Sequence, residues 1–307
     1  VKKTSFFKET EMKFNDLMIR KIKVFFKKIR FDFEKLDLIG IHGNTLIHNP
    51  KKNISIQLGD FKLLSKKLNK IIIANFRDND INLGGEGAPL VPIYHQAVFS
   101  KANKNIMVVN IGGLSNFSFL IGKKRVVSSD IGPGNALIDK YCNMKFKKSF
   151  DNKGQLAKKG CLEKKIVKKW LKKNFLKKKF PRSFDNNFFK IKNFVCNEKV
   201  NKYDMLRTIT FFSAKIISNL KFNFKSKIDY WVFVGGGVSN LTLMGDIRNI
   251  LYGQKILTSD QLGYDSAFIE SSAFAFISIR TLKGMPSAFP ETTGCRTKNI
   301  CGKIYCT

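Results

Sequence analysis

The sequence predicts an α/β protein, because short apolar strands alternate along the chain with segments of helical periodicity. An amphipathic pattern over residues 14–34 predicts a helix. Apolar runs at 38–41, 54–57 and 71–74 predict strands, and the run at 230–234 predicts a buried strand that ends in three glycines. With 307 residues, of which 43% are apolar, the chain can build one large core or two smaller ones.

The middle of the chain predicts a second structural unit, which opens with a hairpin. Strands are expected at 106–110 and 117–121, on either side of a Gly-Gly turn. The apolar pair at 126–127 then leads to Asp130, and a helix is expected to begin near Asn135. Further helices are expected at 154–175, 201–222 and 265–282.

The composition indicates a soluble, cytoplasmic protein. No apolar run reaches the ~18 residues that a membrane-spanning helix needs, and no opening segment has the pattern of a secretion signal. None of the six cysteines forms a Cys-x-x-Cys pair, and no histidine lies near the cysteines at the C-terminus. We therefore expect reduced thiols and no metal site built from protein side chains.

The formal net charge of +33 has two interpretations. A basic surface could hold nucleic acid through its phosphates. Alternatively, the charge reflects a biased composition, because Lys, Asn, Ile and Phe are all abundant, as an AT-rich genome would produce. We favour the second interpretation, since the lysines are spread along the chain and the densest run, 158–179, has the spacing of a solvated helix face. Nucleic-acid binding stays a remote alternative.

The strongest chemical signal is the segment Asp-Ile-Gly-Pro-Gly-Asn at 130–135. A strand delivers Asp130 to a loop in which Gly132 and Gly134 permit close approach of a ligand. Asn135 then starts a helix, whose free backbone N–H groups attract anions. A carboxylate at a strand end beside a phosphate site can serve as a general base. An ordinary strand–turn–helix, with Asp130 as a turn former, stays open as the alternative.

Two further glycine segments follow apolar strands. Paired glycines, Gly112 and Gly113, stand between two strands, where backbone amides can wrap around a phosphate. A run of three glycines, followed closely by Asn240, lies between a strand and a helix, where a flat ring or a phosphate can approach the backbone; the run is Gly235, Gly236 and Gly237. A plain hairpin turn and close helix–strand packing are the respective alternatives.

Polar side chains in glycine-rich loops upstream suit the recognition of a sugar. His42 and Thr45 lie in one such segment, and Arg77 and Asp80 lie in another. Glu270 stands within an apolar helical run, where an unpaired carboxylate is costly to bury, so it either faces water or faces a ligand. For the two other histidines, His48 and His95, we expect a structural role.

Taken together, these segments resemble the anhydro-N-acetylmuramic acid kinase family of the actin-like ATPase superfamily. The resemblance runs in order from about residue 38 to residue 305. The matching segments are 42–45, 56–60, 76–80, 84–92, 110–116, 130–135, 235–240, 270–276, 293–294 and 302–305.

The resemblance implies a two-lobed, actin-like (ribonuclease H-like) α/β fold around an ATP cleft. The first lobe would comprise residues 1–105, completed by about 271–307, and residues 106–270 would form the second lobe with the nucleotide-binding loops. The family's reaction converts 1,6-anhydro-N-acetylmuramic acid, ATP and water to N-acetylmuramic acid 6-phosphate and ADP, in the recycling of cell-wall sugars. The resemblance thus implies ATP and Mg²⁺ as cofactors and a small amino sugar as substrate, and a homodimer is compatible with it.

The family's functional roles carry over to numbered positions of this chain. Asp130 would take a proton from the water that attacks the anomeric carbon. Nucleotide would be bound by Gly112, Gly113, Gly132, Gly134, Asn135, Gly235, Gly236, Gly237 and Asn240. The sugar pocket would be shaped by His42, Thr45, Arg77, Asp80 and Glu270.

One departure from the family pattern concerns the opening phosphate loop, Gly-Thr-Ser-x-Asp-Gly, which has no counterpart in this chain. We expect a first lobe that is incomplete at its N-terminus and has an unpaired sheet edge. Either the sequence starts too late or the protein is truncated. In the second case, the alternative function is a catalytically weak or inactive family member that only binds the sugar.

Overall fold

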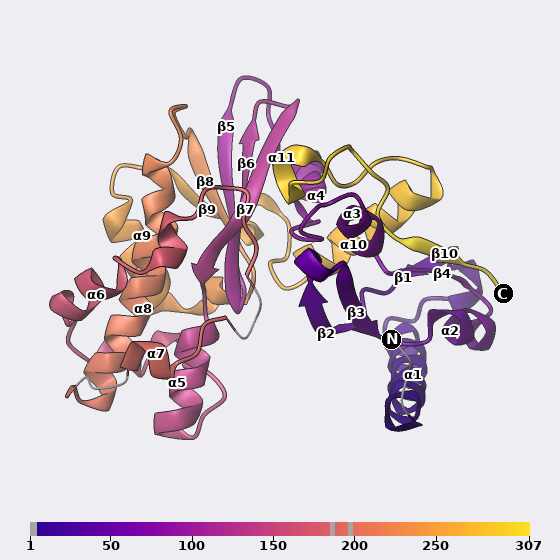
Figure 1. Cartoon of the computed structure of the whole chain (residues 1–307), viewed down its shortest axis with the longest axis horizontal. Coiled ribbons are helices and arrows are strands. Elements are labelled where there is room, and N and C mark those ends of the chain that lie inside the picture. Colours follow the sequence, from indigo (N-terminus) through magenta and orange to yellow (C-terminus); the bar gives the residue numbers. More distant parts are fainter. Residues whose placement is uncertain (1–4, 185–187, 196–198) are drawn as a thin grey trace. The chain divides into compact units, whose positions relative to one another are not determined.

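The computed structural model describes residues 5–184, 188–195 and 199–307 (Figure 1). The chain divides into two compact units, one of Val1–Leu90 with Ser271–Thr307 and one of Val91–Glu270. The second unit begins earlier than residue 106, because helix α4 (Pro92–Phe99) packs against two strands of the second unit's sheet.

The first unit is built around a three-stranded sheet that joins distant parts of the chain. Its strand order is β1-β4-β10, with β1 parallel and β10 antiparallel to β4. The strands are β1 (Leu38–Gly40), β4 (Ile71–Ala74) and β10 (Lys303–Tyr305), and a separate hairpin pairs β2 (Asn44–Asn49) with β3 (Ile54–Leu58). Thr45 therefore lies on a strand, and the C-terminal strand completes a sheet begun near the N-terminus.

The core of the first unit lies between this sheet and two helices, α1 (Ser5–Lys28) and α2 (Phe61–Leu68). Phe61, Leu64 and Ile72 are almost fully buried in it. Helix α2 begins where the carboxylate of Asp60 accepts the N–H of Leu63 at 3.0 Å. Helix α1 starts before the predicted residue 14 and ends at Lys28.

The second unit contains a five-stranded sheet of order β7-β6-β5-β8-β9. The strands are β5 (Asn105–Ile111), β6 (Leu114–Ile121), β7 (Arg125–Pro133), β8 (Tyr230–Val234) and β9 (Ile256–Thr258). Strand β6 is antiparallel to both β5 and β7, while β8 is parallel to both β5 and β9. This is the arrangement of a ribonuclease H-like sheet, and the predicted α/β fold class is confirmed.

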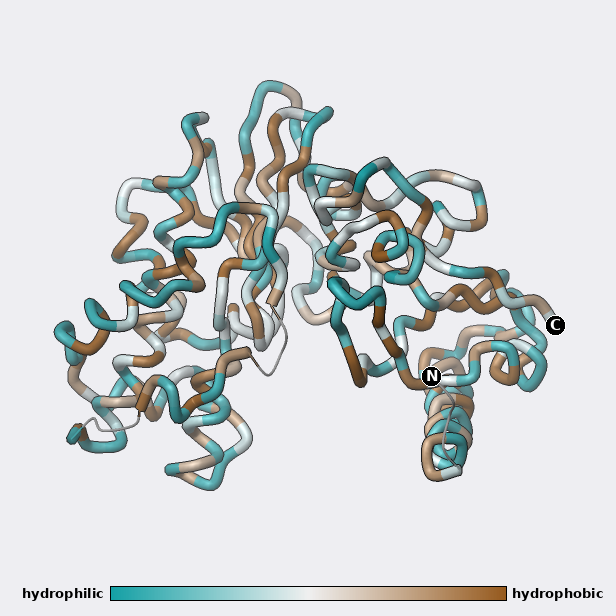
Figure 2. Tube along the Cα trace, in the orientation of Figure 1, coloured by the Kyte–Doolittle hydropathy of each residue, from teal (hydrophilic) through white to brown (hydrophobic). Residues whose placement is uncertain are grey.

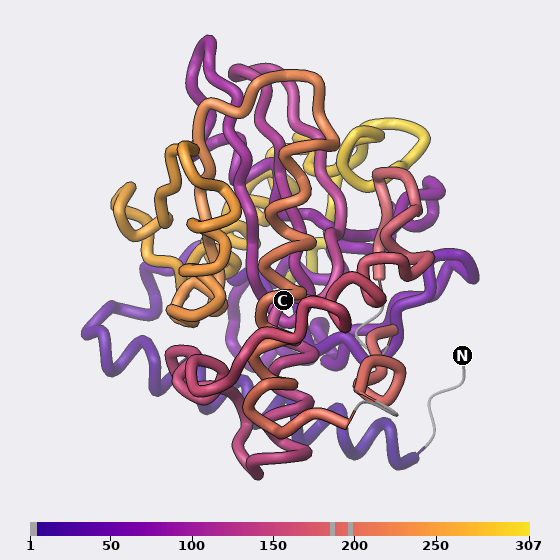
Figure 3. Tube along the Cα trace, turned by 90° about the vertical axis from the view of Figure 1, so that its left-hand side faces the viewer, coloured from indigo at the N-terminus to yellow at the C-terminus, as the bar shows by residue number. Residues whose placement is uncertain are grey.

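Both faces of this sheet are covered, as the alternation along β5 shows. Met107 and Val109 belong to the larger core cluster, whereas Ile106 and Val108 belong to a second cluster with Phe99 of α4. The hydrophobic stretches along these strands are visible in Figure 2. Figure 3 shows α8, in orange, running over the face that carries the larger cluster.

The remaining helices lie mostly in the second unit. They are α3 (Asp78–Asn82), α5 (Ala136–Phe146), α6 (Lys164–Trp170), α7 (Lys192–Val195), α8 (Lys202–Ser218), α9 (Leu241–Ile250), α10 (Ile269–Leu282) and α11 (Pro290–Thr293). Along the described ranges, none of the helices combines the length and apolarity needed to cross a membrane.

The prediction of one helix over residues 154–175 is wrong. The segment contains only short helical pieces, of which α6 is the longest, between turns. Gly154 has φ +71°, outside the helical region, and Gly160 is extended. A Cβ at Gly160 would lie 2.2 Å from the carbonyl oxygen of Tyr203, so the chain leaves the helix where it meets α8.

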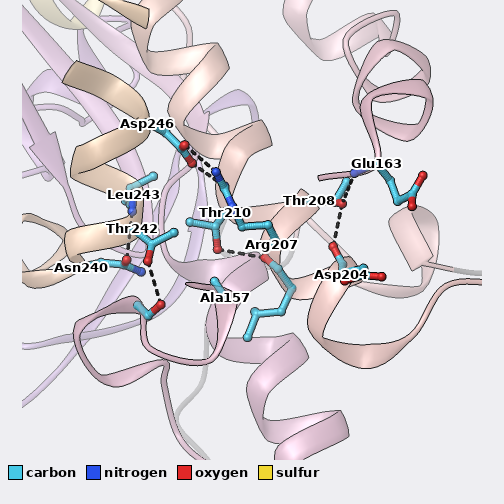
Figure 4. A network of polar contacts seen from close by, with 12 residues as sticks. Ala157, Glu163, Asp204, Arg207, Thr208, Thr210, Asn240, Thr242, Leu243 and Asp246 are labelled. Atoms are coloured by element: carbon cyan, nitrogen blue, oxygen red, sulfur yellow. Dashed lines mark hydrogen bonds and ion pairs between the residues drawn. The ribbon is translucent and has the colours of Figure 1, made fainter. Parts of the chain in front are cut away.

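A buried ion pair joins α8 to α9 (Figure 4). The Arg207 guanidinium donates to both carboxylate oxygens of Asp246, at 2.6 and 2.7 Å. Only 7% of the Asp246 side chain is exposed. Two-point pairing of this kind fixes the rotation of one helix against the other.

Replacing Arg207→Met is expected to lower the free energy of unfolding by about 3 kcal/mol, because Asp246 would be left buried without its cation. Urea unfolding measures this loss, and Arg248→Met on the exposed face of α9 is the control. Equal stability of the two variants would show that the ion pair contributes nothing beyond packing.

His95 on α4 has the structural role expected from the sequence. It is buried, and its Nδ1 lies 2.9 Å from the Ser118 hydroxyl. Burial lowers the pKa of His95 to about 3, so the folded protein holds this imidazole neutral over most of the pH range.

Acid should therefore destabilise the protein through His95. The unfolded state binds a proton near pH 6.5 and the folded state does not, so stability is complete above pH 6.5 and falls toward pH 3. The loss is at most ~1.4 kcal/mol per pH unit. When the pH is lowered from 7 to 5, the free energy of unfolding of His95→Gln should fall by roughly 2 kcal/mol less than that of the wild type. Equal losses in urea titrations at the two pH values would contradict this.

Candidate active site

The glycine turn after β5 is bonded directly to the start of α5. The N–H groups of Gly134 and Ala136 both donate to the Gly113 carbonyl at 2.9 Å, and the Asn135 N–H donates to the Gly112 carbonyl at 2.9 Å. The turn after β5 and the start of α5 belong to separate sequence motifs. Their hydrogen bonds make them one cluster of loops at the point where β5 and β7 end.

The glycine run after β8 joins the same cluster. A Cβ at Gly235 would lie 2.2 Å from Oδ1 of Asn110, and one at Gly237 would lie 2.2 Å from Cγ2 of Ile111. Gly235 also has φ +86°, a conformation that favours glycine. Glycine is thus required at both positions for β8 to end against β5.

The glycines of the cluster divide into packed and open ones. At Gly134, a Cβ would meet the Gly112 carbonyl oxygen at 2.5 Å, and at Gly132 it would meet Ile216 at 2.9 Å. At Gly113 the nearest atom would be 3.9 Å away, and at Gly236 no atom lies within 4 Å. The packed glycines serve the fold, while the open ones leave backbone accessible to a ligand.

The asparagines predicted for nucleotide binding occupy the starts of two helices. The Asn240 side-chain oxygen accepts the Leu243 N–H at 3.0 Å and so caps α9 (Figure 4). Asn135 stands directly before α5, and no side-chain capping bond is made there. The described contact of Asn240 is therefore structural, and its contact with nucleotide stays a prediction.

Asp130 is buried near the end of β7, with 6% of its surface exposed. Its Oδ2 accepts the Phe184 N–H at 2.8 Å, and its own N–H donates to the Arg182 carbonyl at 3.0 Å. The pairing of β7 with β6 shifts register just beyond Asp130, with Ile131 as the extra residue. The main chain around residues 182–184 thus orients the carboxylate, which the sequence did not predict.

In the first unit, His42 and Arg77 are in direct contact. Arg77 Nε donates to His42 Nε2 at 3.1 Å, so His42 Nδ1 carries the proton and donates to the Gly43 carbonyl at 2.8 Å. Burial and then the Arg77 charge lower the pKa of His42 to about 4. The imidazole is therefore neutral at pH 7, and the Phe274 ring lies 4.7 Å from it.

Asp80 is fully buried and connects two loops of the first unit. It accepts hydrogen bonds from Gly87 N–H at 2.7 Å, Thr293 hydroxyl at 2.6 Å and Asn299 amide at 3.2 Å. Arg77 donates to the carbonyl of the same Gly87 at 2.7 Å. Arg77 and Asp80 thus fix one loop together, and the described contacts of Asp80 are structural.

Two other residues, Thr45 and Glu270, were predicted to contact the sugar. Thr45 on β2 accepts a long hydrogen bond of 3.5 Å from Gln57. Glu270 is exposed near the start of α10. Sequence reasoning missed Arg182, Thr293 and Asn299, of which only Thr293 belonged to a recognised motif.

The chain is similar to one protein family along almost its whole length. The family model described as anhydro-N-acetylmuramic acid kinase matches residues 2–307. The anhydro-N-acetylmuramic acid kinase of Rhodopseudomonas palustris is 34% identical over 275 residues, which cover 89% of this chain and 74% of the relative. That of Clostridioides difficile is 34% identical over 303 residues, covering 94% and 79%.

Among solved structures, the similarity is remote. The activator of the 2-hydroxyisocaproyl-CoA dehydratase from Clostridium difficile, with bound ADPNP, is 11% identical and has a TM-score of 0.43. The match covers 86% of this chain and 83% of the activator.

The division into packed and open glycines predicts opposite effects of two alanine substitutions. Gly235→Ala should lower the free energy of unfolding by about 2 kcal/mol or more, because φ is positive and the methyl group meets Asn110. Gly236→Ala should change stability by less than about 0.5 kcal/mol and weaken ATP binding several-fold. Thermal unfolding and calorimetry measure the two effects. Unchanged ATP affinity in Gly236→Ala would show that no ligand approaches this glycine.

Proposed function

This chain belongs to the anhydro-N-acetylmuramic acid kinase family, and from that premise we propose how its own residues carry out the reaction. It is a sugar kinase that uses ATP. We propose that it opens 1,6-anhydro-N-acetylmuramic acid with water and phosphorylates O6, giving N-acetylmuramic acid 6-phosphate and ADP. The observation that carries the proposal is the bonded cluster of glycine loops beside Asp130, at one edge of the second unit's sheet.

The ATP phosphates are assigned to the turn after β5 and the start of α5. The backbone at Gly113 is open, and a helix N-terminus beside it favours negative charge. The open Gly236 and its neighbours after β8 would border the nucleotide. Gly132 and Gly134 support these loops through packing.

Mg²⁺ fits this arrangement as a partner of the phosphates. In the part of the chain that the structure describes, no group of three His, Cys, Asp or Glu side chains could hold a metal ion. Mg²⁺ usually keeps several waters and binds through substrate phosphates with one or two carboxylates. When bound with ATP, it would neutralise charge on the phosphates.

Asp130 is proposed as the general base. It takes a proton from water, whose oxygen forms a bond to the anomeric carbon as the bond from that carbon to O6 breaks. The released O6 attacks the γ-phosphorus of ATP, and ADP leaves. A carboxylate has two oxygens and about four acceptor sites, so the hydrogen bond from Phe184 can orient it while it still accepts a proton.

The sugar is assigned to polar residues of the first unit. His42 is neutral and held in one tautomer, and Arg77 provides a positive charge beside it. Asp80 holds the loop that Arg77 contacts, so its effect on sugar binding is through that loop. Thr45 and Glu270 are kept as proposed contacts on the basis of the family resemblance.

ADP should form only when the anhydro-sugar is present with ATP and Mg²⁺.

Asp130→Asn should lower kcat by about 10² to 10⁴, because the base is lost, while the Kd for ATP stays within about twofold. A coupled ADP assay and calorimetry measure these quantities, and Asp265→Asn on an exposed turn is the control.

Wild-type turnover in Asp130→Asn would remove this residue from its role. Sugar binding by the wild type without ATP binding or turnover would instead favour the alternative of a non-catalytic sugar-binding protein.

A further inference from the structure

The outer edge of β7 is occupied by a loop segment. Because β7 is the first strand in the sheet order, β6 pairs with only one of its edges. Residues 175–184, here called the strap, lie along the other edge. The Arg182 N–H donates to the Ser129 hydroxyl oxygen at 2.8 Å, and the Asp130 N–H donates to the Arg182 carbonyl at 3.0 Å.

The Arg182 side chain donates hydrogen bonds both to β7 and to the strap itself. Its guanidinium donates to the carbonyls of Asp130 at 3.1 Å and Ile131 at 2.7 Å on the strand. It also donates to the carbonyls of Phe175 at 3.0 Å and Lys178 at 2.8 Å within the strap. With the Leu176 carbonyl at 3.4 Å, five carbonyls from two segments thus converge on one cation.

This cation is buried between aromatic rings. Only 8% of Arg182 is exposed, and its guanidinium lies 4.7 Å from the Phe180 ring centre and 5.4 Å from that of Phe184. Burial lowers the pKa of Arg182 to about 10, and the nearby Asp130 charge acts in the opposite direction. Arg182 therefore stays charged at pH 7 and exerts an attraction on the Asp130 carboxylate.

The same segment supplies the hydrogen bond that orients Asp130. Phe184, two residues after Arg182, donates its N–H to Asp130 Oδ2 at 2.8 Å. We propose that Arg182 is a positioning residue, which holds the strap so that the Phe184 amide fixes the direction of the Asp130 carboxylate. This inference rests on the proposed function, because it assumes that the direction of this carboxylate matters for turnover.

A buried arginine such as Arg182 can either stabilise the fold or position a neighbouring side chain. If Arg182 only stabilises the fold, its loss lowers the fraction of folded protein and leaves the kcat of each folded molecule unchanged. If it positions Asp130, its loss lowers kcat per folded molecule while KM for ATP and sugar changes little, because the open glycines are untouched.

The test uses Arg182→Met and the conservative Arg182→Lys, with Arg125→Met at the exposed start of β7 as the control. We expect kcat per folded molecule to fall about 10- to 100-fold in Arg182→Met, with both KM values within about threefold. Arg182→Lys keeps the charge and should recover part of this loss. The control should retain wild-type kinetics.

The folded fraction, ATP binding and turnover are measured separately. The folded fraction comes from circular dichroism and thermal unfolding, and ATP binding comes from calorimetry. Wild-type kcat per folded molecule in Arg182→Met overturns the inference. If Arg182→Met does not fold, Arg182→Lys decides: a lowered kcat at near-native stability supports positioning, and an unchanged kcat overturns it. Full activity of Asp130→Asn, by contrast, would contradict the proposed base and not the role of Arg182 in the fold.

Discussion

Three strands of the second unit end at the same edge of one sheet, and the site depends on this constraint. Because β6 is antiparallel to both β5 and β7, those two strands run the same way, and β8 is parallel to β5. Gly112 and Gly235 directly follow β5 and β8, and Asp130 lies near the end of β7. Strand direction thus brings together segments far apart in sequence, and hydrogen bonds between the loops fix them there.

Glycine has two different uses at this edge. A glycine loses more backbone freedom on folding than other residues, by about 0.5–1 kcal/mol relative to alanine. At Gly134, Gly235 and Gly237 this cost is accepted because a side chain would collide with β5 or its turn. At Gly113 and Gly236 the surroundings impose no such requirement, and the exposed backbone there is open to a ligand.

The sequence predicted the parts of the fold that local patterns control. The strands at 71–74 and 230–234 were located correctly, because compact apolar runs end at polar or glycine residues. The segment 154–175 was predicted as one helix, because its lysine spacing is helical and the contact between Gly160 and Tyr203 is not visible in sequence.

The candidate site was predictable to the same degree. Glycine loops and Asp130 carry recognisable motifs, and the structure places the loops together within one unit. Arg182 carries no motif, because its role comes from contact with the edge of β7 that β6 leaves open, about fifty residues earlier in the chain. The structural role of Asp80 was likewise hidden, since Thr293 and Asn299 reach it only after the C-terminal segment has folded back.

The central claim is that the Asp130 carboxylate activates the attacking water. The most direct measurement is a crystal structure of the protein with a non-hydrolysable ATP analogue, Mg²⁺ and the anhydro-sugar. A carboxyl oxygen of Asp130 should lie about 3 Å from a water that faces the anomeric carbon. A carboxylate directed away from the sugar, with another side chain holding that water, would contradict the account.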